Sequence, residues 1–109
     1  MPQYLIMVNA PAPADWMEAP PDELAAHERY GSQIEELGAT TVYAAALQPA
    51  TTATTIRGDV VTEGPFADSA EVIGGLSVIE ARDLEHAVEI AKLCPATIRG
   101  SVEVRPLLG

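Results

Sequence analysis

The chain has 109 residues, 48% of them hydrophobic and only 5% aromatic, so we expect one domain over residues 1–109 with an aliphatic core rather than a disordered chain. A formal net charge of −10 at pH 7 repels phosphate groups, which argues against nucleic acids and anionic membranes as partners. The single cysteine allows no intramolecular disulfide, and no targeting or membrane-spanning segment is evident, so a cytoplasmic location is expected.

The first half of the chain predicts a strand, a loop, a helix and a second strand. The continuous apolar run Tyr4–Val8 predicts a strand covered on both faces, the second of them by another subunit. A proline-rich loop follows and contains the only tryptophan, Trp16. We then expect a helix over Asp22–Leu37 that ends at Gly38, and a strand over Thr40–Leu47.

The second half predicts a hairpin, a strand, a helix and a final strand. Gly58-Asp59 is a two-residue turn signature between two β-prone runs, and residues 66–72 are predicted as a loop or a single helical turn. The expected elements are Ala53–Arg57, Val60–Glu63, Gly74–Ala81, a helix from the N-cap Asp83 to Leu93, and Val102–Arg105. This order is typical of an α+β ferredoxin-like antiparallel sheet with both helices on one face.

The most distinctive motif is TEGPFADSAEVIGGLSVIEA at residues 62–81, followed by SVEVRP at residues 101–106. It resembles the signature of YCII-related proteins, in the branch named for an Asp-Gly-Pro-Phe motif, and the similarity covers nearly the whole chain. Two positions depart from that branch. Glu63 stands where the aspartate is usual, and Ala70 replaces a lysine, so any role for a cation at that position is lost.

The resemblance implies a ferredoxin-like domain that pairs sheet face to sheet face into a dimeric α/β barrel, and therefore a homodimer. Members with known chemistry resemble muconolactone isomerase, and one is a dehydrochlorinase of a chlorinated hydroxyquinol. In such relatives a His–Asp pair is the proposed acid–base machinery. Some members are encoded beside extracytoplasmic-function sigma factors.

His27 is the leading catalytic candidate, because it lies on the apolar stripe of the first predicted helix and an ordinary histidine pKa of about 6.5 suits proton transfer. The resemblance places its proposed histidine on this same helix. A catalytic histidine needs an acceptor, and the candidates are Glu63, Asp68, Glu35 and Glu36. As alternatives, His27 is a core-edge residue bonded to a backbone carbonyl, and Glu63 accepts N–H groups of its own turn.

A ligand pocket is expected from Trp16, Tyr30 and Phe66, with Arg105 available to hold an anionic substrate. Trp16 and Phe66 could equally anchor the core, and Arg105 could form an ion pair with a neighbouring strand or the other subunit.

His86 and Cys94 are not expected to take part in the chemistry. His86 is predicted on the solvent side of the second helix, and Cys94 is predicted in the core. Two histidines and one cysteine without ligand spacing predict no metal site, and no cofactor is expected.

Three functions remain open. The first is a lyase or isomerase with a small apolar cavity between the first helix and the sheet, which would hold a compact aromatic or lactone-like substrate for His27. The second is a non-catalytic small-molecule-binding or regulatory dimer, linked to extracytoplasmic-function sigma factors. The third is a plain dimerisation module.

Overall fold

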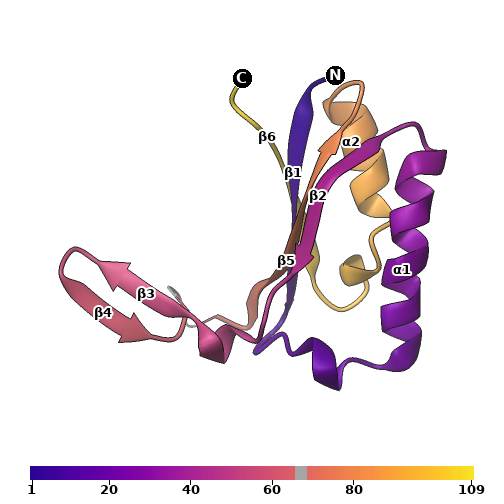
Figure 1. Cartoon of the computed structure of the whole chain (residues 1–109). Helices are drawn as coiled ribbons and strands as arrows, with labels where there is room; N and C mark the ends of the chain where they lie inside the picture. The colour runs from indigo at the N-terminus through magenta and orange to yellow at the C-terminus, as the bar shows by residue number, and fades with distance from the viewer. Residues whose placement is uncertain (66–68) are drawn as a thin grey trace.

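The computed structural model describes residues 1–65 and 69–109, and it contains one four-stranded sheet, a two-stranded hairpin and two helices (Figure 1). Short 3₁₀ turns lie at Trp16–Glu18, Ala50–Thr52 and Pro95–Thr97. In chain order the elements are β1 (Gln3–Pro11), α1 (Pro21–Glu36), β2 (Thr40–Ala46), β3 (Thr54–Arg57), β4 (Val60–Glu63), β5 (Glu71–Glu80), α2 (Leu84–Lys92) and β6 (Ser101–Pro106).

The strands of the main sheet lie in the order β2-β5-β1-β6, and every neighbouring pair is antiparallel. Both helices cover the same face of this sheet, while the hairpin β3–β4 projects away from the helices (Figure 1). This is the ferredoxin-like arrangement, so the predicted α+β fold is confirmed.

Local signals in the sequence define the helix ends. Pro21 occupies the first turn of α1, where its missing N–H costs nothing. At the other end Gly38 has a φ of +87°, and the N–H of Ala39 donates to the carbonyl of Ile34, which closes the helix in a Schellman motif. Asp83 caps α2 as predicted, because its carboxylate accepts the backbone N–H of His86 at 2.8 Å.

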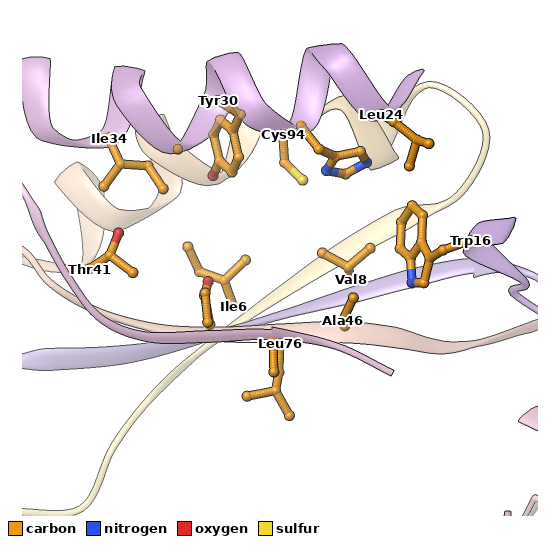
Figure 2. A pocket seen from close by; sticks show the side chains of 16 residues that line it. Ile6, Val8, Trp16, Leu24, Tyr30, Ile34, Thr41, Ala46, Leu76 and Cys94 are labelled. Atoms are coloured by element: carbon orange, nitrogen blue, oxygen red, sulfur yellow. The ribbon is translucent and has the colours of Figure 1, made fainter. Parts of the chain in front are cut away.

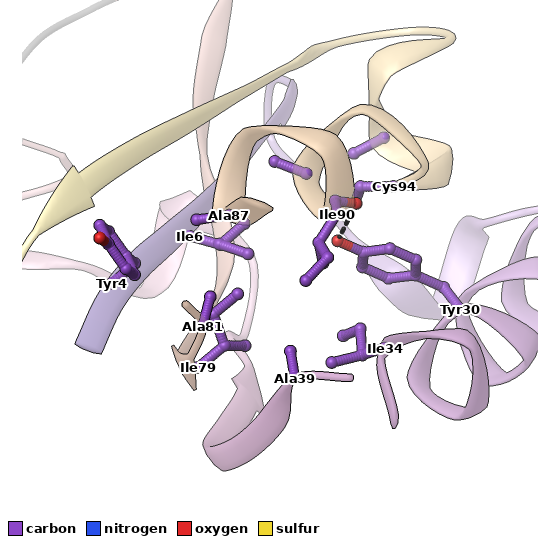
Figure 3. Packing of buried hydrophobic residues seen from close by; sticks show 12 residues of the cluster. Tyr4, Ile6, Tyr30, Ile34, Ala39, Ile79, Ala81, Ala87, Ile90 and Cys94 are labelled. Carbon is purple, nitrogen blue, oxygen red and sulfur yellow. Dashed lines mark hydrogen bonds between the residues drawn. The ribbon is translucent and has the colours of Figure 1, made fainter. Parts of the chain in front are cut away.

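The hydrophobic core lies between the sheet and the two helices (Figure 3). Successive side chains of a strand point to opposite faces, so β1 directs Tyr4 and Ile6 to the helices and Leu5 and Met7 to the open face. The hydroxyl of Tyr30 on α1 donates to a backbone carbonyl of α2 at 2.8 Å and ties the two helices together. The described residues of this chain thus cover one face of β1, and the cover of its other face by another subunit stays a prediction.

The strand β5 begins at Glu71, whereas the sequence predicts a loop up to residue 72 and a strand from Gly74. The difference arises at a β-bulge: Val8 pairs with Gly75, and Asn9 pairs with Ile73, so that Gly74 has no partner on β1. The bulge absorbs the glycine and lets the ladder continue to Glu71, which the sequence pattern interrupted by two glycines does not reveal.

His86 is buried, with only 3% of its surface exposed, and its predicted place on the solvent side is wrong. Its Nδ1 accepts the backbone N–H of Arg82 at 3.1 Å, so the proton lies on Nε2, which donates to the carbonyl of Leu37 at 2.7 Å. The imidazole thus joins the start of α2 to the end of α1. A contact between segments so far apart in the chain has no local signal.

Candidate functional site

A cavity of about 380 Å³ lies between α1 and the sheet, at the low end of the usual range for ligand sites (Figure 2). It exists because small residues face each other: Gly31 on α1, and Ala44 and Ala46 on β2. A Cβ atom on Gly31 would meet nothing within 4 Å. Because all three residues are small, they leave room for a small molecule between the helix and the sheet.

His27 lines this cavity from α1, as its place on the apolar stripe predicts. Its Nε2 atom is buried and has no hydrogen-bond partner among the residues that the structure describes. Burial lowers the pKa of His27 below its ordinary value, although the negative charge of Glu23 opposes this. The imidazole is therefore neutral at neutral pH. The alternative interpretation of His27 is a core-edge histidine bonded to a backbone carbonyl. Its Nε2 atom makes no such bond within the described residues.

Trp16 and Tyr30 line the same cavity. The indole Nε1 of Trp16 donates to the carbonyl of Gly74 at 2.8 Å, and its ring meets that of His27 edge-on, with centroids 5.2 Å apart. Burial, and to a smaller extent the adjoining Cys94, raises the pKa of the Tyr30 hydroxyl, whose proton is already committed to a backbone carbonyl. Tyr30 therefore shapes the wall and does not titrate there at neutral pH.

Cys94 also borders the cavity, and only 1% of its surface is exposed. Burial raises the pKa of its thiol, although a backbone hydrogen bond at Ala96 opposes this. A protonated thiol is a poor nucleophile, so Cys94 serves as a small core residue, as the sequence predicts.

No aspartate or glutamate is among the cavity-lining residues in the part of the chain that the structure describes. Glu63 is exposed on β4, in the hairpin that points away from α1 (Figure 1). Glu35 and Glu36 are exposed at the end of α1. Asp68 and Phe66 lie outside the described residues.

The acid that acts on His27 is Glu23, one helical turn earlier, and sequence reasoning missed it. Its signal was the i, i+4 spacing, which places both side chains on the same side of α1. Glu23 also forms an ion pair with Arg99 at 2.6 Å, so its carboxylate is already engaged.

Arg105 lies on β6 and is not part of the cavity wall. It pairs with Glu103 at 2.7 Å, and both side chains are substantially exposed. The expected ion pair therefore forms within one strand, since residues i and i+2 share a face of the sheet, and not with the neighbouring strand of this chain.

The described residues contain no group of three or more His, Cys, Asp or Glu side chains that could hold a metal ion. Within the same part of the chain, no helix is both long enough and apolar enough to cross a membrane.

Comparison with known proteins extends the motif resemblance to the whole domain. Residues 3–108 match the family model described as the YCII-related domain. None of the curated proteins matches the chain.

Proposed function

Because this chain belongs to the YCII-related family, we propose that it binds a compact aromatic or lactone-like molecule beneath α1, with His27 as the acid–base group of a lyase or isomerase reaction. The observation that carries this proposal concerns His27, which lines an apolar cavity: its Nε2 atom is buried and has no hydrogen-bond partner among the described residues. Leaving such an atom unpaired costs about 1–3 kcal/mol, and a ligand with one polar group would recover that cost.

The chemistry of the walls narrows the ligand class. No lysine or arginine is among the described residues that line the cavity, so the site favours an uncharged molecule over an anion. Apolar side chains such as Ile6, Val8 and Leu24 suit a ring or a short aliphatic body. The polar atom of the ligand would meet His27, while the hydroxyl-bearing residues Thr41 and Ser77 offer further hydrogen bonds from the sheet.

A neutral imidazole can act here as a general base. Its Nε2 lone pair would take a proton from a carbon or oxygen of the substrate. In an isomerisation that proton returns to another atom of the same molecule. In an elimination the C–H electron pair forms the new double bond, and the leaving group departs with the electrons of its own bond.

A non-catalytic ligand-binding or regulatory role is the second candidate. It is favoured by the lack of a lining carboxylate to orient His27 among the described residues, and by the engagement of Glu23 with Arg99. The link to extracytoplasmic-function sigma factors belongs to this candidate and stays a prediction.

Ligand binding is tested with three probes titrated into isotope-labelled protein by NMR: phenol, toluene and benzoate. We expect phenol to perturb the cavity residues and benzoate to bind more weakly. His27→Leu should weaken phenol about tenfold through the lost hydrogen bond and leave toluene unchanged, whereas His27→Gln should retain phenol. Phenol that binds the His27→Leu variant as well as the wild type would contradict the anchoring role.

Catalysis is tested separately with an unsaturated γ-lactone, α-angelica lactone, in D₂O. An isomerase would move its double bond and incorporate deuterium, and His27→Gln should slow this by at least about a hundredfold. Phenol binding without any proton exchange would favour the non-catalytic candidate.

We also propose that a second copy packs on the open face of the sheet. On that face Val78 of β5 lies between Leu5 of β1 and Tyr43 of β2, and Leu76 pairs with Met7. The side chain of Tyr43 is 60% exposed. An apolar face of this kind is typical of a surface that is covered in the assembled protein, and the homodimer that the resemblance implies would cover it.

A further inference from the structure

Trp16 reaches the cavity from the loop between β1 and α1. It begins the 3₁₀ turn Trp16–Glu18, which Asp15 caps by accepting the backbone N–H of Met17 at 3.0 Å. From there the indole reaches between α1 and the strands at one end of the cavity (Figure 2). A loop residue thus forms a wall of the site.

The indole is tied to the sheet at the β-bulge of β5. The carbonyl of Gly74 accepts two hydrogen bonds, from Trp16 Nε1 at 2.8 Å and from the backbone N–H of Leu47 at 2.9 Å. A Cβ atom on Gly74 would lie 3.5 Å from Cζ2 of Trp16, so the ring packs closely on the glycine. The bulge and the glycine together hold the indole in one orientation.

The opposite contact of the indole is with His27. The two rings lie at 83° with centroids 5.2 Å apart, which is the edge-to-face geometry of stable aromatic pairs. The second torsion of a histidine side chain is broad and nearly two-fold, so an imidazole without neighbours exchanges its two nitrogens readily. An indole fixed on the sheet restricts that rotation.

Trp16 also separates the cavity from a second hollow of about 260 Å³, because its side chain lines both. The second hollow is bordered by charged residues, Asp15, Glu18, Glu23 and Arg99. The indole therefore stands between an apolar cavity and a hollow with charged residues at its border.

We propose that Trp16 is a positioning residue for His27: through its bond to Gly74 it holds the imidazole in one ring orientation at the cavity wall and shields it from the charged hollow. This inference rests on the proposed function, in which Nε2 meets the ligand. It assigns to Trp16 no contact with reacting atoms, and it explains why a tryptophan stands in a loop otherwise rich in proline and alanine.

The test follows the two histidine side chains by NMR in the absence of any ligand, in the wild type, Trp16→Phe, Trp16→Ala and Met17→Ala. Met17 follows Trp16 in the same 3₁₀ turn, is 92% exposed and lines neither hollow, so it is the matched control. His86, the only other histidine, is held by backbone groups elsewhere and serves as an internal reference for an intact fold.

In Trp16→Ala we expect the pKa of His27 to rise toward its ordinary value, because water reaches Nε2 and the burial that lowers the pKa is relieved. Among the neighbouring groups, the carboxylates of Glu23, Asp15 and Glu18 would raise the pKa of His27 further, and the guanidinium of Arg99 would oppose the rise. Tyr30 and Cys94 also border the cavity, but both are protonated and carry no charge. Trp16→Phe keeps a ring but loses the bond to Gly74, so its His27 pKa should lie between that of the wild type and that of Trp16→Ala. The His27 pKa of Met17→Ala should resemble that of the wild type.

An unchanged His27 titration in Trp16→Ala, with His86 signals intact, would overturn the inference. If both Trp16 variants unfold, the wild type itself decides: cross-relaxation between indole and imidazole protons supports the positioning role, and its absence refutes it. No ligand is used, so a failed phenol titration would overturn the proposed function and leave this result standing.

Discussion

At His27 the fold buries a nitrogen that it does not satisfy, while at His86 it satisfies both ring nitrogens with backbone groups. Buried polar atoms are nearly always bonded, so the two residues have different physical roles. His86 holds two helix ends together and needs no ligand. His27 carries an unused hydrogen-bonding atom at the wall of a cavity, which is the reason for treating it as functional.

The lowered pKa of His27 predicts how stability depends on pH. The folded state favours the neutral imidazole, whereas the unfolded chain takes up a proton near a pH of about 6.5. The contribution of the neutral imidazole to the free energy of unfolding is thus fully present above that pH, and it is lost as the pH falls through the pKa that His27 has in the folded state. Urea unfolding measures the free energy of unfolding at each pH. Between pH 8 and pH 5 this free energy should fall less in His27→Gln than in the wild type, and an equal fall in both proteins would contradict the prediction.

At the scale of the element, the missing side chains of glycines matter to α1 as much as the apolar residues of its stripe. Gly31 lies inside the helix, where glycine is unfavourable, and nothing occupies the space that its side chain would fill. Gly38, in contrast, adopts a positive φ to end the helix. The first glycine opens a cavity and the second terminates a turn, although both fall on the same stripe in the sequence.

Gly31→Ala should raise the free energy of unfolding by about 0.5–1 kcal/mol, because the alanine lowers the backbone entropy cost and its Cβ meets no atom. Gly31→Leu should fold but lose phenol binding, since its side chain enters the cavity. Thermal unfolding and the NMR titration measure the two effects. Ser32→Ala, one residue along on the exposed surface of α1, is the control and should bind phenol normally.

At the scale of the whole molecule, the two faces of the main sheet differ. Two helices cover one face of the sheet. The other face carries Leu5, Met7, Leu76, Val78 and Tyr43, and neither helix of the described structure covers it. The hairpin extends from the same region with Ile56, Val60 and Val61 each more than half exposed. A two-stranded ribbon is marginal by itself, which is a further reason to expect a second copy.

Sedimentation at micromolar concentration should therefore show a dimer. Tyr43→Glu places a like charge on the open face of both copies and should shift the protein toward monomer. Met17→Glu, on a side chain that is 92% exposed in the 3₁₀ turn before α1, should leave the dimer intact. A wild-type monomer would refute the dimer proposal.

Much of the fold was predictable because its signals are local. The Gly58-Asp59 turn, the Asp83 cap and the Gly38 stop each act within a few residues, and the structure contains all three features. The apolar spacing of α1 likewise placed His27 on the side that meets the sheet. The electrostatic influence of Glu23 was also open to prediction from its spacing, but it was overlooked.

By itself the sequence determined the order of elements, the family and the candidate histidine, because turn chemistry, capping and hydrophobic periodicity are properties of neighbouring residues. Tertiary structure alone decided the rest. It buried His86 against Leu37, paired Asn9 with Ile73 around the bulge, and brought Trp16 to His27. These contacts depend on how distant segments pack. Packing also decided which buried polar side-chain atoms found partners, and among the described residues Nε2 of His27 did not.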